Sequence, residues 1–323
     1  MKIYFYYGII LTIKKGDIMR KFIISDIHGH GDLYNSVMAY LENVSKVDDV
    51  TLYINGDLID RGSDSGTILL DLISRINNPN HPFKIVYLGG NHELMMYRVF
   101  EKRRKGIYVP NYNDWYHNGG RVTDDSLTNT LNDKEKILEV VNFISNLKIY
   151  HKFEETLNNK SIVLVHASSP LNVKDECDIY IKDLNLISDY YVWAREDSSR
   201  FPFRCHIGNK HYFSVIGHTP NNKRFGYFYN EQENYLNIDG GCAPYVCGHY
   251  QYDHFPLVEV KDHYLKILTF NSNNEIIYGN YFQNNKSIPF TSEELAYERR
   301  LLNKQLVPKK ILRLEDDMIS YKD

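Results

Sequence analysis

The chain has 323 residues and a formal net charge of −3, with 43% hydrophobic and 24% charged residues. This composition is typical of a globular protein, and its charge gives no reason to expect a nucleic-acid partner. No run approaches the roughly 18 apolar residues of a membrane span, so we expect no membrane partner. Four cysteines without a CxxC pair favour free thiols in a reducing compartment. We therefore expect a cytoplasmic protein, and we expect it to be a monomer.

The organisation predicted along the chain is one folded domain between two terminal segments. Residues 1–18 are interpreted as a non-native or disordered leader, because codons for residues 14–19 can contain a purine-rich ribosome-binding site directly before the Met19 codon. An intact mass that includes residues 1–18, from protein of the native gene, would contradict a start at Met19. Residues 19–290 form the predicted domain, since no repeat or linker interrupts them. Residues 291–323 are a charged helix and tail.

Three short apolar runs near the start each lead into a turn with polar residues that can bind metals. The runs 22–24, 51–55 and 84–88 are predicted strands because they are rich in β-branched and aromatic residues. Apolar residues at helical spacing predict helices over 30–46 and 65–77. This β-α-β-α-β order predicts a parallel sheet, whose carboxyl-end edge is where ligands bind in open α/β proteins.

The rest of the chain changes from helices to strands at about residue 148. A helix is predicted over 92–104, and its basic run at 102–105 is interpreted as a solvated face rather than a substrate patch. We expect a loop-rich segment over 106–133, a helix over 134–147, and one helix or two short ones over 175–190. Strands are predicted over 148–155, 162–165, 213–216 and 235–238, with a closing hairpin over 257–260 and 264–270.

Residues that can bind metals recur at the ends of these predicted strands. They are Asp26, His28, Asp57, Asn91, His166 and His218. One histidine after a strand is usually just a satisfied polar residue, but six positions in the same context favour a common site. Their oxygen and nitrogen donors suit Mn, Fe or Zn better than a structural thiolate site. Two such ions could share a carboxylate and a bridging hydroxide in a phosphoryl displacement.

The spacing of these residues resembles one enzyme family. The motifs Asp-X-His-Gly at 26–29, Gly-Asp-X-X-Asp-Arg-Gly at 56–62 and Gly-Asn-His-Glu at 90–93 resemble the phosphoprotein phosphatase (PPP-type) branch of the metallophosphoesterases. The segments around His166 and His218 are similar to its two later histidine motifs. The segments 115–120 and 238–241 most resemble the bacterial and phage lambda-type subgroup. The resemblance covers roughly residues 20–270.

The resemblance implies an α/β fold, the metallophosphoesterase four-layer αββα sandwich, with a dinuclear metal site at the carboxyl-end edge of the strands. It implies a calcineurin-like phosphoprotein phosphatase that hydrolyses phospho-Ser and phospho-Thr, with phospho-Tyr as a further substrate. A metal-bridging hydroxide would attack directly, so that no phosphoenzyme forms. The cofactors would be two divalent ions, with manganese first and iron or zinc as alternatives.

The resemblance also implies a role for each residue of the site. Asp26 and His28 would hold the first ion, Asp57 would bridge both, and Asn91, His166 and His218 would complete the second. His92 would be the general acid, oriented by Asp60, because a carboxylate beside an imidazole stabilises the protonated ring. Substrate phosphate would be bound by Arg61, Arg195 and Asn91, since arginine offers a planar pair of donors.

Several alternatives remain open. Arg195 could instead pair with Glu196 or Asp197 on the surface, and Arg200 and Arg204 are weaker phosphate-binding candidates. Ser25 stands where the family usually has glycine. A dinucleoside tetraphosphate hydrolase with the same metal core is the alternative function, although the motifs at 60–62 and 91–93 favour the phosphatase branch. A catalytically inactive scaffold is the third.

Overall fold

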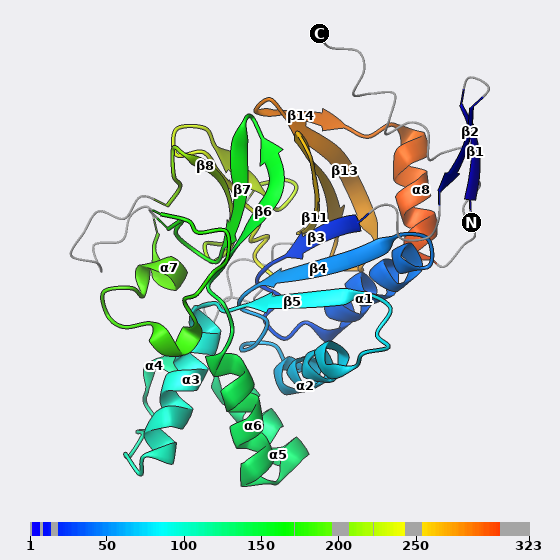
Figure 1. The fold of residues 1–323 in the computed structure, drawn as a ribbon. Coiled ribbons are helices and arrows are strands. Elements are labelled where there is room, and N and C mark those ends of the chain that lie inside the picture. Colours follow the sequence, from blue (N-terminus) through cyan, green and yellow to red (C-terminus); the bar gives the residue numbers. More distant parts are fainter. Residues whose placement is uncertain are drawn as a thin grey trace.

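The computed structural model describes the side chains of residues 19–170, 172–195, 207–221, 223–242 and 254–303, and the backbone of 2–6 and 9–13. Two β-sheets pack face to face, and helices cover the outer face of the larger sheet (Figure 1). The mixed α/β class and the packed sheets agree with the fold expected from the sequence.

The larger sheet has seven strands in the order β14-β13-β12-β11-β3-β4-β5. Strands β3, β4 and β5 run parallel to one another, as predicted. Strands β11 to β14 form an antiparallel meander, which joins β3 through β11. The strands are β3 (Met19–Ile24), β4 (Asp49–Asn55), β5 (Lys84–Leu88), β11 (Phe255–Lys261), β12 (Tyr264–Phe270), β13 (Ile276–Gln283) and β14 (Lys286–Pro289).

The smaller sheet has five strands in the order β6-β7-β8-β10-β9. Its three central strands, β7, β8 and β10, run parallel to one another, and an antiparallel strand borders them on each side. The strands are β6 (Tyr150–Leu157), β7 (Lys160–Val165), β8 (Tyr212–Ile216), β9 (Phe228–Asn230) and β10 (Tyr235–Asn237).

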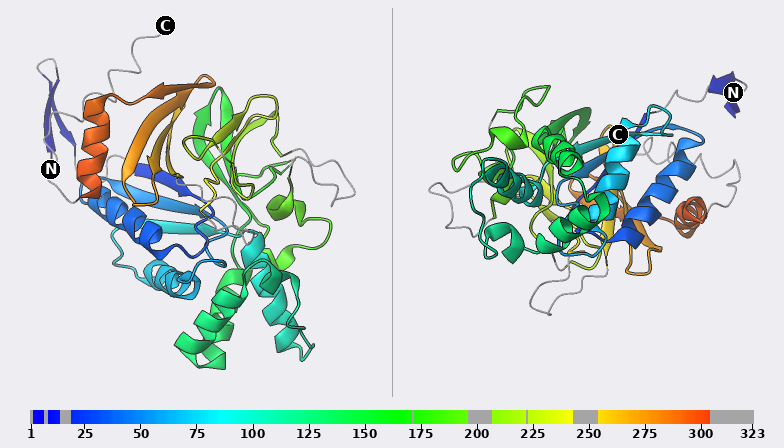
Figure 2. Two further views of the ribbon diagram at one scale, coloured as in Figure 1. Left: turned by 180° about the vertical axis from the view of Figure 1, so that it is seen from behind. Right: turned by 90° about the horizontal axis from the view of Figure 1, so that it is seen from below.

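The two sheets share an apolar core. Ile23 and Val258 of the larger sheet pack in one cluster with Leu164 and Phe213 of the smaller sheet, and all four are fully buried. Each strand alternates its side chains, so the opposite face of the larger sheet needs a second cover. That cover is formed by α1 (Gly31–Ser45), α2 (Ser65–Asn77) and α8 (Ser292–Leu302) (Figure 2).

The remaining helices lie beyond the carboxyl end of β5 and beside the smaller sheet (Figure 1). The first group is α3 (Asn91–Arg104), α4 (Asp114–His117), α5 (Arg121–Leu131) and α6 (Lys134–Ser145), and the second is the 3-10 helix η1 (Ile181–Asp183) and α7 (Tyr190–Trp193). Val192 and Ala194 pack in one cluster with Val163 and Val165, so the segment around α7 covers the outer face of the smaller sheet.

One sequence prediction about these segments was wrong. The stretch 106–133 was expected to be loop-rich but contains α4 and α5. Thr, Asp and Asn dominate α5 and have weak helix propensity, so the helix depends on packing of residues such as Leu127. The stretch 175–190 was expected to contain one helix or two short ones, and the structure has two short ones, η1 within the stretch and α7 beginning at its last residue. Strands β9, β13 and β14 were not predicted, although β13 is rich in the β-branched and aromatic residues typical of a strand.

The terminal segments are described in part. Strands β1 (Lys2–Tyr6) and β2 (Ile9–Ile13) pair antiparallel, and the start at Met19 stays a prediction. At the other end, residues 304–323 lie outside the described part of the chain. Among the described residues, none of the helices combines the length and apolar character needed to cross a bilayer.

A buried cluster of charges fastens α8 to the larger sheet. Arg20 of β3 donates two hydrogen bonds to Glu259 of β11, at 2.6 and 2.7 Å. Lys266 of β12 lies 2.7 Å from Glu298 of α8, which also accepts a 2.5 Å bond from the Tyr40 hydroxyl of α1. Burial opposes ionisation of Glu259, but Arg20 outweighs it and holds the pKa of this carboxyl well below its usual range.

We predict that Glu259→Gln lowers the free energy of unfolding by about 3–5 kcal/mol, because it leaves buried cations without their partner. Because the folded-state pKa is lowered, the stabilisation in the wild type is fully present above the ordinary glutamate pKa of 4.5 and is lost as the pH falls below it. Urea unfolding at pH 7 and at lower pH measures both effects. Glu101→Gln, which breaks the outer Glu101–Arg104 pair, is the control and should change stability little. Equal losses in the two variants would contradict the prediction.

Candidate metal centre

The carboxyl ends of five strands meet between the two sheets and bring the predicted metal-binding residues together. Asp26 and His28 follow β3, Asp57 follows β4, and Asn91 begins α3 directly after β5. His166 and His218 follow β7 and β8 of the smaller sheet. All six side chains are buried. Each sheet thus contributes one side of the site.

Asp57 lies in the middle of this group. Its Oδ2 atom is 3.6 Å from His28 Nε2, and its Oδ1 atom is 3.3 Å from His166 Nε2. Two sets of side chains have atoms close enough to share a metal ion, namely His28 with Asp57 and His92, and Asp57 with His166 and His218. Asp57 is the residue common to both sets.

The hydrogen bonds of two histidines orient their Nε2 atoms toward Asp57. His28 Nδ1 lies 3.0 Å from the Ile59 carbonyl and His166 Nδ1 lies 2.7 Å from the Asn55 carbonyl. A carbonyl only accepts, so each Nδ1 carries a proton, and Nε2 is the nitrogen of each ring that could serve as a ligand atom. Buried carbonyl partners of this kind are the usual outer partners of metal-binding histidines.

Asn91 and His218 complete the second set. Asn91 Oδ1 is 3.0 Å from His166 Nε2 and 2.8 Å from His218 Nδ1. The other ring nitrogen of His218 is buried and has no hydrogen-bond partner among the described residues. A buried polar atom without a partner is costly, so a ligand of this atom would stabilise the site.

The electrostatics of the site call for added positive charge. Burial and the neighbouring Asp239 raise the pKa of Asp26, and burial raises the pKa of Asp239 to about 6. Burial opposes ionisation of Asp57, but His166 and His92 outweigh it and lower the pKa of this carboxyl. Burial also opposes a charge on His166, yet Asp57 raises the pKa of this ring to about 10. A divalent cation would balance the buried carboxylates. The donor set, which consists of carboxylates, an amide oxygen and imidazoles, suits cations of the Mn, Fe or Zn type.

Asp26 occupies a different position from the other candidates. Both of its carboxylate oxygens lie 3.1 Å from the backbone nitrogen of His218, and Oδ2 accepts a 2.5 Å bond from Ser25. It belongs to neither of the two sets, whereas His92 belongs to one. The assignment of Asp26 as a ligand and of His92 as a non-ligand therefore stays a prediction.

Backbone conformation, rather than strand alternation, aims these side chains. Strand β3 ends at Ile24, and Asp26 and His28 have φ values of 56° and 48°, so both are left-handed. Asp57 and His218 share this conformation, with φ values of 51° and 67°. Such strain in a non-glycine residue costs on the order of 1–3 kcal/mol and clusters at functional sites. The convergence expected at this edge of the sheet is present, and the left-handed turns after the strands direct the side chains.

A second pair of buried residues lies beside Asp57. His92 Nδ1 is 2.6 Å from Asp60 Oδ2, and His92 Nε2 is 3.7 Å from Asp57 Oδ2. The Arg61 guanidinium reaches into the same space, with Nη2 at 3.1 Å from His92 Nε2 and Nη1 at 3.3 Å from His28 Nε2. The predicted general acid, its orienting carboxylate and a phosphate-binding arginine thus lie together.

The second predicted phosphate-binding arginine lies at the rim of the site. Arg195 is exposed, and its Nη2 donates to the His218 carbonyl at 3.0 Å. Its alternative partners Glu196 and Asp197, and the weaker candidates Arg200 and Arg204, lie outside the described residues. The structure therefore places Arg195 beside the metal centre without testing the alternatives.

Sequence reasoning missed a carboxylate that supports Asp57. Glu93 accepts hydrogen bonds from the backbone nitrogens of Asp57 and Leu58, at 2.9 and 3.1 Å, and from the Tyr87 hydroxyl at 2.6 Å. It also caps α3 through a 2.8 Å bond from the Gly90 nitrogen. The signal was present as the fourth residue of Gly-Asn-His-Glu, three positions into a helix, where a glutamate can cap backwards.

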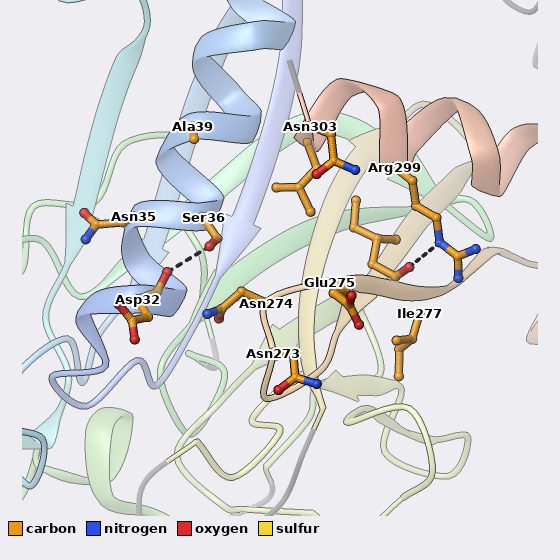
Figure 3. A pocket seen from close by; sticks show the side chains of 12 residues that line it. Asp32, Asn35, Ser36, Ala39, Asn273, Asn274, Glu275, Ile277, Arg299 and Asn303 are labelled. Atoms are coloured by element: carbon orange, nitrogen blue, oxygen red, sulfur yellow. Dashed lines mark hydrogen bonds between the residues drawn. The ribbon is translucent and has the colours of Figure 1, made fainter. Parts of the chain in front are cut away.

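A polar groove lies elsewhere, between α1, α8 and the turn from β12 to β13 (Figure 3). Its volume is about 820 Å³, and Asp32, Asn274, Glu275 and Arg299 are among its lining residues. Arg299 donates to the Ile276 carbonyl at 2.7 Å. The groove contains none of the residues of the metal centre, so its chemistry is separate.

Known proteins similar to this chain include several phosphatases. Residues 19–253 match the family model described as calcineurin-like phosphoesterase, and no curated protein sequence matches the chain. A mutant of a cold-active protein tyrosine phosphatase is 15% identical, with a TM-score of 0.47 and 78% of each chain covered. A protein serine/threonine phosphatase from Saccharomyces cerevisiae, with similarity to human phosphatase PP5, is 17% identical, with a TM-score of 0.47, and covers 79% of this chain and 80% of that chain. A candidate diadenosine tetraphosphatase is 16% identical, with a TM-score of 0.43, and covers 84% of this chain and 94% of that chain.

We predict that Asp57→Asn weakens binding of Mn²⁺ by more than about 100-fold. Loss of a partner of a metal ligand typically costs about 10–100-fold, and Asp57 is the carboxylate shared by both candidate sets. Equilibrium dialysis followed by elemental analysis measures the effect. Asp175→Asn removes an exposed carboxylate and is the control. Wild-type metal content in Asp57→Asn would refute the central place given to this residue.

Proposed function

The chain belongs to the calcineurin-like phosphoesterase family, and we propose that it is a PPP-type phosphoprotein phosphatase, most like the bacterial and phage lambda-type enzymes. The substrates are phospho-Ser and phospho-Thr monoesters, with phospho-Tyr as a further substrate. The observation that carries the proposal is the buried pair of His92 and Asp60, 2.6 Å apart, with His92 Nε2 facing both Asp57 and Arg61.

The proposed cofactors are two divalent ions, with manganese first. Asp26 and His28 would hold one, Asp57 would be shared, and Asn91, His166 and His218 would hold the other. When bound, such ions neutralise phosphate charge and lower the pKa of a water molecule so that it can attack phosphorus. All six of these side chains are buried at the strand ends.

The arginines bind and orient the phosphate. Arg61 reaches His28 and His92 through separate nitrogens, so its planar fork faces the centre and can engage two phosphate oxygens. Arg195 approaches from the rim at His218, and Asn91 adds an amide from the start of α3. Donors on two sides of a phosphate would hold it in one orientation.

His92 supplies the proton that the leaving group needs. The oxygen of a water molecule forms a bond to phosphorus, the ester P–O bond breaks, and the Nε2 proton of His92 passes to the leaving oxygen. The products are inorganic phosphate and a neutral alcohol. The proton lost by the attacking water returns to His92 through solvent, so the step needs no co-reactant. Asp60 keeps Nε2 aimed at the leaving oxygen by accepting from Nδ1.

This proton donor favours monoesters over the alternative function. An alkoxide from serine or threonine is a poor leaving group and benefits strongly from a general acid. Hydrolysis of a dinucleoside tetraphosphate breaks a P–O–P anhydride, and the nucleotide that leaves is a stable anion that needs no proton. The buried Asp60–His92 pair therefore supports the phosphatase over the tetraphosphate hydrolase, and the complete set of candidate ligands argues against an inactive scaffold.

A monomer in the cytoplasm is part of the same proposal, and Cys177 and Cys242 are free thiols.

We predict that His92→Asn lowers kcat on a phosphothreonine peptide by about 10²–10⁴-fold, the usual contribution of a general acid. The variant should retain Mn²⁺, in contrast to Asp57→Asn. Steady-state kinetics with parallel metal analysis tests both points. Equal metal loss in the two variants would contradict the separate roles assigned to these residues.

A comparison of substrates tests the reaction class. The full chain is treated with chelator, reloaded with Mn²⁺, and assayed on p-nitrophenyl phosphate, a phosphothreonine peptide and diadenosine tetraphosphate. We expect restored activity on the first two and weak activity on the third. Turnover of diadenosine tetraphosphate alone would favour the alternative, and no turnover despite bound metal would favour the scaffold.

A further inference from the structure

Two side chains from the helical segment after α3 donate hydrogen bonds to the carboxylate of Asp60. We propose that Trp115 of α4 and Thr123 of α5 are positioning residues, which fix Asp60 so that it aims His92 at the leaving group. The inference rests on the proposed function, and it gives a role to the Trp115 motif and to a stretch that sequence reasoning treated as a loop.

The carboxylate of Asp60 is held from three sides. Oδ2 accepts from His92 Nδ1 at 2.6 Å and from Trp115 Nε1 at 2.8 Å, and Oδ1 accepts from the Thr123 hydroxyl at 2.6 Å. All four side chains are 0–1% exposed. The terminal torsion of an aspartate is broad when it is left free. Donors on both oxygens fix this torsion, and with it the plane in which His92 is held.

Thr123 also holds the backbone of Asp60. The Asp60 nitrogen donates to Thr123 Oγ1 at 3.0 Å, so a single hydroxyl accepts from the main chain and donates to the side chain of the same residue. Asp60 and Arg61 have φ values of 73° and 72°, a left-handed pair that is costly for non-glycine residues. An outside contact is needed to keep such a turn, and Thr123 provides it.

Glycines in the Trp115 motif make the arrangement possible. Gly119 has a φ of 97°, and its carbonyl accepts from the Arg61 nitrogen at 3.2 Å. A Cβ atom on Gly120 would lie 2.3 Å from Trp115 Nε1, so only glycine leaves room for the indole edge that reaches Asp60. The same short segment therefore anchors both the orienting carboxylate and the neighbouring arginine.

Trp115 and Thr123 are also connected to α3, the helix that contains His92. Trp115 packs edge-on against Phe100 of α3, with ring centroids 5.8 Å apart. Arg103, near the end of α3, makes two hydrogen bonds of 3.0 and 2.6 Å to Asp124, the residue after Thr123. Part of the basic run thus joins α3 to α5. His92, Trp115 and Thr123 are therefore linked by contacts between their helices as well as through Asp60.

A residue that merely satisfies a buried carboxylate would affect all substrates alike. A residue that aims the general acid matters most where the leaving oxygen needs a proton. A serine or threonine alkoxide needs one, whereas p-nitrophenolate is a stable anion that leaves without it. The ratio of kcat on the two substrates separates a positioning role from a structural one.

The test compares Thr123→Val, Thr123→Ser and Trp115→Phe in the Mn²⁺-loaded full chain. Thr128→Val makes the same change at an exposed position of α5 and is the matched control. We expect Thr123→Val and Trp115→Phe to lower kcat on a phosphothreonine peptide by about 10–100-fold, with little change in KM and a clearly smaller loss on p-nitrophenyl phosphate. Thr123→Ser, which keeps the hydroxyl, should restore most of the peptide activity. Equal losses on both substrates, or no loss in Thr123→Val, would overturn the proposal.

A readout that does not depend on turnover accompanies the kinetics. In protein with ¹⁵N-labelled histidine, the Nδ1 proton of His92 reports its bond to Asp60. We expect its resonance to move in Thr123→Val and Trp115→Phe and to stay in place in Thr128→Val. An unmoved resonance in folded Thr123→Val would overturn the proposal. If the wild type hydrolyses neither substrate, the proposed function fails, and the resonance alone then decides whether these residues position His92.

Discussion

The carboxylate of Asp57 lies between three imidazoles, and most of the site depends on keeping it there. Its backbone is left-handed, with a φ of 51°, and its nitrogen is held by Glu93 at 2.9 Å. Its Oδ1 atom in turn accepts from the backbone nitrogen of His92 at 3.1 Å. Strand β4 and helix α3 are therefore joined through Asp57, and the histidines of both sheets are arranged around it. The strain of the turn is offset by these buried hydrogen bonds.

Two buried clusters of charge in the described part of the chain differ in how fully their charges are matched. Beneath α8, Arg20 and Lys266 neutralise Glu259 and Glu298 at hydrogen-bond distance, so this cluster is complete without any ligand. At the strand ends, Asp57 lies among the imidazoles of His28, His92 and His166, and two further carboxylates, Asp26 and Asp239, are buried nearby. A cation completes the second cluster but has no place in the first. The unmatched charge distinguishes a functional site from a structural one.

The junction of the two sheets decides where the cation site can form. Asn55, the last residue of β4, donates to the Val165 carbonyl at 3.1 Å, and its own carbonyl accepts from His166. One residue therefore joins the ends of β4 and β7 and orients a histidine from the opposite sheet. The helical segment with Trp115 and Thr123 likewise orients a site residue, Asp60, through hydrogen bonds. Both supports come from parts of the chain remote in sequence from the residues they hold.

The sequence by itself determined the parallel start of the larger sheet and the residues gathered at its edge, because apolar periodicity and turn residues are local signals. Asp57 could be named in advance for the same reason, whereas His92 and Asp60 were named from the resemblance of the motifs at 56–62 and 90–93 to a known family. Only the tertiary structure decided that α5 is helical, that β13 and β14 extend the sheet, and that Glu93, Trp115 and Thr123 hold the site. The contacts that Glu93, Trp115 and Thr123 make with residues 57–60 join positions 35 to 63 residues apart, and the Thr123–Asp60 bond has the largest separation. Local propensity does not indicate contacts between residues so far apart in the sequence. Packing and buried hydrogen bonds across the fold supply the free energy that forms them.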